Sequence, residues 1–223
     1  MFARSTSTVC FALLLGALPL GGCGTAREAY YNAWEKAGYA KRDRLVDNVK
    51  AARDEQDVAK TQFTSALDQF KQITKFEGGD LEKAYNKLKS EYDGCAQRAE
   101  AVRERIKSVR NVGGALFTEW KGEIRQIEDD AALQKQSRAL YDKTYEGYET
   151  LLERMDAAAA SMKPVLTKYN NRVLFLKANL NAQAIGSLAG TEVDLGKDID
   201  ELVRQMQASI TEADQFMAGL KKG

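Results

Sequence analysis

Residues 45–73 read LVDNVKAARDEQDVAKTQFTSALDQFKQI, and the spacing of apolar side chains in this stretch decides the fold. They recur at alternating intervals of four and three residues without a break. The series is Leu45, Val49, Ala52, Gln56, Ala59, Phe63, Ala66, Phe70 and Ile73, in which only Gln56 is polar. This alternation is the heptad pattern of a helix that packs along a seam against other helices. We therefore predict one long helix here, over residues 26–76.

The same alternation returns twice further along the chain. After Gly78-Gly79, where Asp80 is placed to cap a helix, it predicts a second helix over residues 80–127, with Gly113 and Gly114 inside it. Its series is Leu81, Tyr85, Leu88, Tyr92, Cys95, Ala99, Val102, Ile106 and Val109. A third helix is predicted over residues 131–184, in register across Pro164. Its series is Tyr141, Tyr145, Tyr148, Leu152, Met155, Ala159, Met162, Leu166, Tyr169, Val173, Leu176 and Leu180.

A last and shorter series predicts a fourth helix over residues 192–218, after a turn at 186–190 with Thr191 as a cap. Short turns between long helices make neighbours antiparallel. The predicted fold is therefore all-α: an elongated antiparallel coiled-coil-like helical bundle with three long helices and one shorter C-terminal helix. A helix of about 50 residues is about 75 Å long, and the fourth helix covers about half of that rod. If the seams are satisfied within one chain, the protein is a monomeric bundle; the observation that decides is whether the half at the turn between helices one and two leaves Phe63, Phe70 and Phe76 uncovered.

The N-terminal residues predict a lipoprotein signal. Val9 to Leu20 is an apolar run too short to span a bilayer, and Leu20-Gly21-Gly22-Cys23 places a cysteine directly behind two small residues. In such a signal the thiol of Cys23 takes a lipid, and Leu20, Gly21 and Gly22 are recognised by the signal peptidase that cleaves before Cys23. The alternative is an ordinary secretory signal that ends near a cysteine.

This signal predicts three segments: residues 1–22 as the signal peptide, 23–25 as a lipidated tether, and 26–223 as the helical bundle domain. Two or three acyl chains, palmitate among them, would anchor the protein to a membrane permanently. An Asp directly after the lipidated cysteine would resemble an inner-membrane retention signal, but the residue at that position is Gly24. We therefore expect an outer-membrane protein facing the periplasm, with the inner membrane as the alternative.

Composition excludes several function classes. After Arg4 is removed with the signal, 32 Lys and Arg balance 32 Asp and Glu, which argues against nucleic acid as a partner. The chain has no histidine, so Ser/His and Cys/His nucleophiles and histidine metal sites are excluded. Cys95 is the one thiol beyond the signal and Cys23, and its place in the second series predicts a buried, inert thiol rather than a redox-active one. We predict no enzyme activity, catalytic residue, metal or cofactor.

Four stretches resemble a bacterial lipoprotein family known only as domain of unknown function 2959. They are YYNAWEK at 30–36, KRD at 41–43 followed by LVD at 45–47, ALF at 115–117 with Glu119-Trp120, and VLFLK at 173–177 running into NLNA at 179–182. The resemblance covers nearly the whole mature chain. It implies a lipoprotein with a helical, coiled-coil-like body, and no activity or site residues.

Three features have a functional and a structural interpretation. Tyr30, Tyr31, Trp34 and Tyr39 predict either a membrane-proximal aromatic collar or packing of the first turns, and the packing is favoured. Asn179, Asn181 and Gln183 predict either a recognition face or a hydrogen-bonded cap at the end of the bundle, and the cap is favoured. Tyr141, Tyr145, Tyr148 and Tyr169 predict either a ligand site or core packing, and the core is favoured.

The expected function is that of a non-enzymatic scaffold, spacer or docking surface in the cell envelope, held at the membrane by the lipid on Cys23. Its partner would be another envelope protein or a second copy of the chain, bound where the fourth helix leaves apolar surface uncovered. The alternative is a carrier that binds a small molecule or lipid between its helices, against the tyrosines of the third helix.

Overall fold

The computed structural model describes the backbone of residues 23–75, 80–179 and 181–222. Side chains are described from residue 40 onward within those ranges, except at residues 182, 221 and 222. Residues 1–39 and 40–223 form two separate units. Residues 23–39, in the first unit, are helical, and the second unit contains the bundle.

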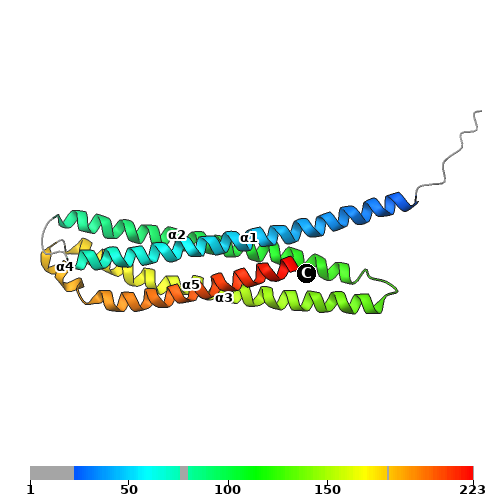
Figure 1. Cartoon of the computed structure of the whole chain (residues 1–223). Helices are drawn as coiled ribbons and strands as arrows, with labels where there is room; N and C mark the ends of the chain where they lie inside the picture. Colours follow the sequence, from blue (N-terminus) through cyan, green and yellow to red (C-terminus); the bar gives the residue numbers. More distant parts are fainter. Residues whose placement is uncertain (1–22, 76–79, 180, 223) are drawn as a thin grey trace, which may run out of the picture. The chain divides into compact units, whose positions relative to one another are not determined.

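Five helices account for the regular structure in the described ranges (Figure 1). They are α1 (Cys23–Thr74), α2 (Leu81–Ile124), α3 (Ala131–Ala178), α4 (Ala182–Leu188) and α5 (Thr191–Lys222). The predicted all-α fold, with three long helices and a shorter C-terminal one, is confirmed. Gly113 and Gly114 lie inside α2, and Pro164 lies inside α3, as the continuous heptad series predicted.

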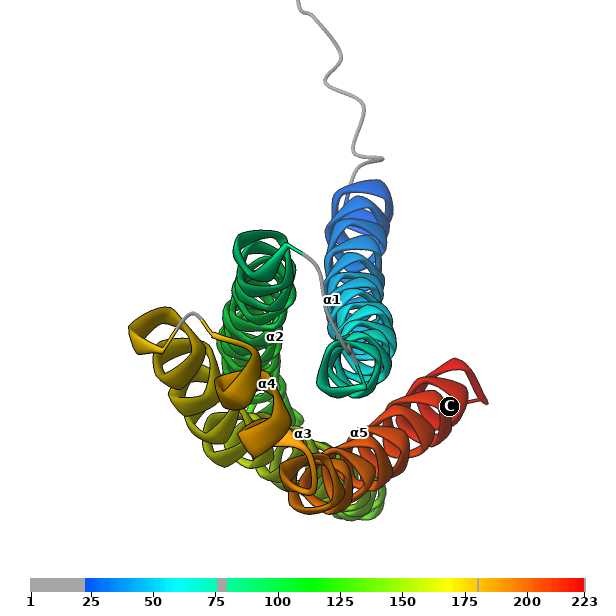
Figure 2. The same cartoon turned by 90° about the vertical axis from the view of Figure 1, so that its left-hand side faces the viewer.

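Within residues 40–223, α1, α2, α3 and α5 lie side by side, as the view along the helices shows (Figure 2). Two contacts fix the direction of α5 against α1. The guanidinium Nε of Arg53 lies 3.2 Å from a carboxylate oxygen of Asp214, and Lys60 Nζ donates to Gln207 Oε1 at 3.0 Å. Residue numbers rise along one helix as they fall along the other, so α1 and α5 are antiparallel.

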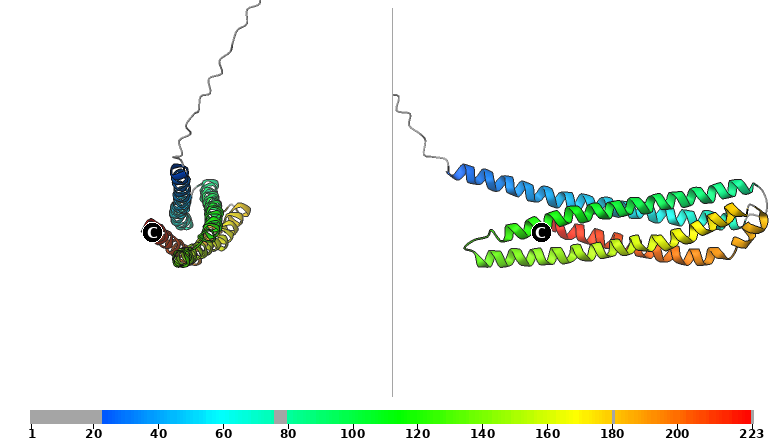
Figure 3. Two further views of the ribbon diagram at one scale, coloured as in Figure 1. Left: turned by 90° about the vertical axis from the view of Figure 1, so that its right-hand side faces the viewer. Right: turned by 180° about the vertical axis from the view of Figure 1, so that it is seen from behind.

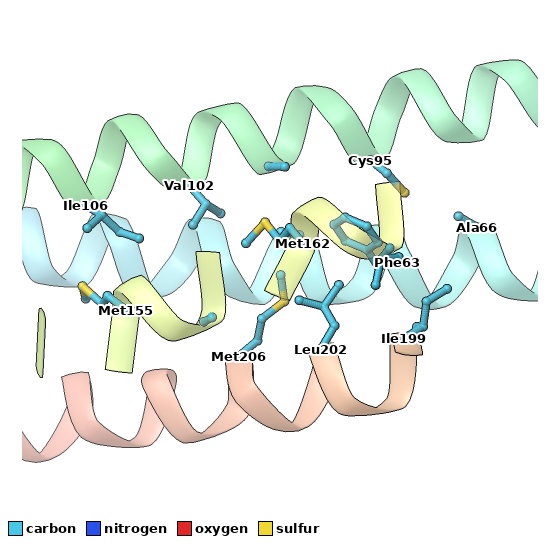
Figure 4. Close-up of a cluster of buried hydrophobic side chains, with 14 of the residues drawn as sticks. Phe63, Ala66, Cys95, Val102, Ile106, Met155, Met162, Ile199, Leu202 and Met206 are labelled. Atoms are coloured by element: carbon cyan, nitrogen blue, oxygen red, sulfur yellow. The ribbon is translucent and has the colours of Figure 1, made fainter. Parts of the chain in front are cut away.

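The heptad series form the core. Each contributes side chains with little or no exposure, among them Phe63 of α1, Met162 of α3 and Leu202 of α5, which point toward one another in Figure 4. Gln56, the polar member of the first series, is also fully buried, and its amide has no hydrogen-bond partner among the described residues.

Side-chain caps set where the helices begin. Asp80 accepts a hydrogen bond from Lys83 N at 3.0 Å, as its position before α2 predicted. Asp130 accepts one from Leu133 N at 2.8 Å and begins α3. The predicted turn at Gly78-Gly79 lies outside the described residues.

The prediction that the third helix reaches residue 184 is wrong, because α3 ends at Ala178 and the separate α4 follows. The side-chain amide of Asn179 donates to Phe175 O at 3.0 Å, and Asn181 Oδ1 accepts from Ala184 N at 2.8 Å. Asn side chains compete for backbone groups at helix ends, which is why the chain breaks here. Their interpretation as caps rather than a recognition face is confirmed for these two residues, whereas the exposed Gln183 makes no capping contact of this kind.

Phe63 and Phe70 are covered, at 1% and 0% exposed, which answers for these two residues the question that the sequence left open. Phe76 lies outside the described residues. The reason is topological: α3 returns the chain to the end of the bundle that holds the loop between α1 and α2, so α5 starts there and covers that half. The C-terminus stops short of the loop between α2 and α3 (Figures 1 and 3). That opposite end is therefore the one α5 leaves uncovered.

Candidate functional site

A groove of about 480 Å³ lies between α2 and α3, on the side of the bundle that faces solvent. It is lined by Arg110, Gly114, Phe117, Thr118, Lys121 and Gly122 of α2, by Arg125 directly after α2, and by Tyr141, Tyr145, Tyr148, Glu149 and Leu152 of α3. All of these residues belong to the second unit. The groove lies toward the end of the bundle that holds the α2–α3 loop.

The groove is open because α2 carries little side-chain bulk along it. Gly114, Thr118 and Gly122 are spaced by four residues and share one face of the helix. A Cβ atom added at Gly114 or at Gly122 would meet no atom within 4 Å. The missing side chains therefore leave space that the neighbouring helix does not fill.

Aromatic rings form the floor. The ring centroid of Phe117 lies 5.8, 5.1 and 4.9 Å from those of Tyr141, Tyr145 and Tyr148. The first two contacts are edge-to-face, the arrangement that ring quadrupoles favour. Tyr141 and Tyr145, one turn apart on α3, stack almost parallel at 5.7 Å. These contacts hold the aromatic side chains against one another.

Tyr148 joins the floor to the backbone of α2. Its hydroxyl donates to the carbonyl oxygen of Arg110 at 3.1 Å, with Val109 O at 3.4 Å. Burial raises the pKa of the phenol to about 12, so it stays protonated and continues to donate at neutral pH. The ring lies against Gly113, where a Cβ would come within 2.4 Å of it.

Charge is distributed unevenly along the groove. Arg110 makes a two-pronged ion pair with Asp156, at 2.7 and 2.9 Å, so its charge is already matched. Glu149 lies at the same end beside Tyr148, and a hydrogen bond to its carboxylate raises the pKa of Tyr145. Lys121 is eight residues beyond Gly113, or about 12 Å along α2. Lys121 and Arg125 thus make the other end positive.

The four tyrosines of the third predicted series do not act together. Tyr141, Tyr145 and Tyr148 line the groove, whereas Tyr169 is in the core of the other half, with ring centroids 6.0 Å from Phe70 and 6.2 Å from Tyr92. Burial strongly raises the pKa of Tyr169. Core packing is confirmed for Tyr148 and Tyr169, which are 3% and 1% exposed, while Tyr145 is 36% exposed.

Cys95 is 1% exposed, and its Sγ lies 3.8 Å from the carbonyl oxygen of Gln62. Burial, together with the nearby Glu91 carboxylate, raises the pKa of the thiol to about 12. Because the thiolate is the reactive form, the geometry agrees with the predicted inert thiol.

The N-terminal predictions lie outside the described residues. This holds for Leu20, Gly21 and Gly22, and for the side chain of Cys23, whose backbone begins α1. The side chains of the proposed aromatic collar, at residues 30, 31, 34 and 39, are also not described. In the described part of the chain, no helix carries an apolar stretch long enough to cross a membrane.

Sequence reasoning missed the α2 side of the groove. The signal was present in residues 110–125, where small residues at intervals of four are flanked by Arg110, Lys121 and Arg125. Glycines inside a predicted helix are a cost to helix stability. They could have been interpreted as positions where the helix surface is left hollow.

No curated protein and no solved structure matches this chain significantly. A family model does match, over residues 30–220, and its description is a protein of unknown function, DUF2959. This span includes all five described helices except the first residues of α1 and the last of α5. All four stretches that resemble this family fall within the matched residues 30–220. The chain therefore belongs to the DUF2959 family.

Proposed function

We propose that this protein is a lipid-anchored helical rod of the cell envelope, without enzyme activity, that provides a docking surface for another envelope protein. The proposal joins two features of the chain. The pattern Leu20 to Cys23 supports a lipid anchor at the N-terminus, at the periplasmic face of the outer membrane or, alternatively, at the inner membrane. The long helices provide a stiff body.

One observation carries the docking role: the apolar stripe that α3 presents to α5 continues past the end of α5. Gly147 faces α5, because a Cβ there would lie 3.6 Å from the ring of Phe216. Leu140 lies seven residues before Gly147, and Leu133 lies seven residues before Leu140, so the three share one face. Leu140 and Leu133 are 52% and 50% exposed.

Within the described residues, the register of α5 leaves these leucines without a partner. Lys222, the last residue of α5, is six residues beyond Phe216, so in an antiparallel pair it falls level with residue 141 of α3. Leu140 is thus at the end of α5, and Leu133 is about 10 Å beyond it. The surface fits an amphipathic helix that continues the line of α5, and we assign that helix to a partner protein.

The test is site-specific photocrosslinking in intact cells. A photoreactive residue replaces Ser137, between the two leucines, and a control replaces Val193, which is 56% exposed on α5. We expect one protein to be captured from Ser137, not from Val193, and to be lost in the double variant Leu133→Lys, Leu140→Lys. Capture of a second copy of the chain, or equal capture from both positions, would overturn the proposal.

The anchor is tested separately. Cells grown with labelled palmitate should incorporate the label into the wild-type protein and not into Cys23→Ser. The wild type should sediment with outer-membrane vesicles, and the variant should appear in the soluble periplasmic fraction. Equal labelling of the two proteins would exclude Cys23 as the lipidated residue.

A second candidate function, that of a carrier, is favoured by the groove between α2 and α3. Three of the four tyrosines that suggested a ligand site line it, and its volume of about 480 Å³ is within the range of small-molecule pockets. Docking and carriage use different faces of α3, so each can be tested without the other.

A further inference from the structure

We infer that the groove between α2 and α3 binds a small amphiphilic anion, meaning a flat apolar body that carries one carboxylate, sulfonate or phosphate group. The inference rests on the carrier function proposed above and names its class of ligand. It is independent of the docking surface at Leu133 and Leu140.

The apolar body would lie on the rings of Phe117, Tyr141 and Tyr145. The two tyrosines stack parallel to each other and edge-on to Phe117, with centroids 5.1 to 5.8 Å apart. These contacts fix the rings against one another, so little side-chain freedom is lost when a flat molecule binds. Opposite them, Gly114 and Gly122 let such a molecule approach the backbone of α2.

The anionic group would lie between Lys121 and Arg125. These cations are four residues apart, and Arg125, directly after α2, keeps a helical backbone conformation, so the two project from neighbouring positions at the end of α2. Both line the groove, and neither has a carboxylate partner among the described residues, whereas Arg110 is paired with Asp156. The guanidinium fork of Arg125 suits two oxygens of one anion, and Lys121 adds a point charge.

Glu149, the carboxylate in the lining, does not oppose this arrangement. Its carboxylate is taken up by the hydroxyl of Tyr145, and it follows Tyr148, which packs on Gly113, whereas Lys121 is two helical turns beyond Gly113 along α2. The groove is therefore polarised, with a matched ion pair and a carboxylate at one end and two unmatched cations at the other. A neutral apolar ligand would leave those two cations without an anionic partner.

Two dyes with the same anilinonaphthalene rings test the charge directly in the intact mature chain. They are 8-anilinonaphthalene-1-sulfonate, which is an anion, and N-phenyl-1-naphthylamine, which is neutral. We expect the anion to bind at least tenfold more tightly to the wild type. In the double variant Lys121→Gln, Arg125→Gln the anion should bind at least tenfold more weakly, and the neutral dye should change by less than threefold.

Two further variants locate the site. Arg105→Gln with Lys107→Gln removes the same charge from exposed positions of α2 outside the groove and should leave both affinities unchanged. Gly114→Leu fills the groove with a side chain that meets no atom at its Cβ, and it should abolish binding of both dyes while the helical circular dichroism stays unchanged.

The outcomes separate the ligand class from the carrier function. Suppose that both dyes bind the wild type, fail to bind Gly114→Leu, and bind the Lys121→Gln, Arg125→Gln variant as tightly as the wild type. The carrier function then stands, and the anionic class of ligand is overturned. If neither dye binds, or if Gly114→Leu binds them normally, both are overturned.

The same chemistry exists in membrane lipids and in soluble aromatic acids, and competition distinguishes them. Dihexanoylphosphatidylglycerol that displaces the sulfonate dye, when dihexanoylphosphatidylcholine does not, assigns the site to an anionic lipid headgroup. Displacement by 1-naphthoate and not by either lipid assigns it to a soluble acid. Displacement by phosphatidylcholine as readily as by phosphatidylglycerol would overturn recognition of the negative charge.

Discussion

Gly113 of α2 lies directly under the ring of Tyr148 of α3, so that a Cβ at residue 113 would be 2.4 Å from two ring carbons. The neighbouring Gly114 has no atom within 4 Å of its Cβ position. Both glycines lie inside α2, where each carries the same conformational cost. Their surroundings give that cost two different explanations: close packing at residue 113 and an open groove at residue 114.

The two glycines should therefore respond oppositely to alanine. Gly114→Ala should raise the free energy of unfolding by about 1 kcal/mol, because alanine favours the helix and meets no neighbour. Gly113→Ala should lower it by about 1 to 2 kcal/mol, because overpacking against Tyr148 outweighs the same gain. Urea denaturation followed by circular dichroism measures both. An equal increase in the two variants would show that Tyr148 moves aside without cost.

Gln56 offers a test of the buried polar position in the first heptad series. Its side chain is fully buried, and neither its amide nitrogen nor its oxygen has a partner in the described structure. Ser209 Oγ of α5 is also buried without a partner in the described structure. The same two contacts between α1 and α5 bracket both residues, Arg53–Asp214 on one side and Lys60–Gln207 on the other. Burial of an unsatisfied amide costs about 1 to 3 kcal/mol.

We therefore expect Gln56→Leu to raise the free energy of unfolding by about 1 to 2 kcal/mol. Gln97→Leu, at an exposed position of α2, is the matched control and should change it by less than about 0.5 kcal/mol. Loss of stability in Gln56→Leu would mean that the amide is hydrogen-bonded in solution. A change in oligomeric state would show that Gln56 fixes the helix register, as polar residues in heptad seams do.

Heptad spacing predicted the long helices and most of their buried residues because a seam must recur every three or four positions to face one core. The end of α3 and the start of α4 are set by Asn179 and Asn181, whose side chains compete locally for backbone groups. The heptad series does not reveal this break, because it continues in the sequence through Leu180. Which end α5 leaves uncovered depends on the path of the chain through α3. The apolar pattern alone does not say at which end α5 begins.

The groove was predictable only on its aromatic side. Tyr141, Tyr145 and Tyr148 are part of the third series, but the same spacing places Tyr169 in the core of the opposite half. The three groove tyrosines differ from Tyr169 in the surface of the helix that faces them, α2, where Gly114 and Gly122 leave space beside Lys121. A series on one helix carries no information about the bulk of its neighbour.

Cys95 should react slowly with thiol reagents in the folded protein. It is 1% exposed, and its raised pKa, about 12, leaves very little thiolate at pH 8. In a chain in which Cys10 and Cys23 are replaced by Ser, Cys95 is the one remaining cysteine. We expect its modification by Ellman's reagent to be more than a hundredfold slower in buffer than in 6 M guanidinium chloride. Equal rates would show that this part of the bundle opens readily.

Tyr148 should make the protein sensitive to alkali. Its phenol has a pKa of about 12 when folded, above the value of about 10 in an unfolded chain. The neutral phenol therefore contributes stability that is fully present below pH 10 and is lost as the pH rises from 10 to 12. Tyr148→Phe has no hydroxyl at residue 148 to ionise, and it lacks the hydrogen bond to Arg110 O, so at pH 8 it should be less stable by the value of that hydrogen bond. Between pH 10 and 12, however, the free energy of unfolding of the wild type should fall by about 1 to 3 kcal/mol relative to that of the variant. Urea denaturation at several pH values measures this, and Tyr169, present in both proteins, cancels from the difference. Two curves that fall in parallel would show that the Tyr148 hydroxyl ionises as readily in the bundle as in the unfolded chain.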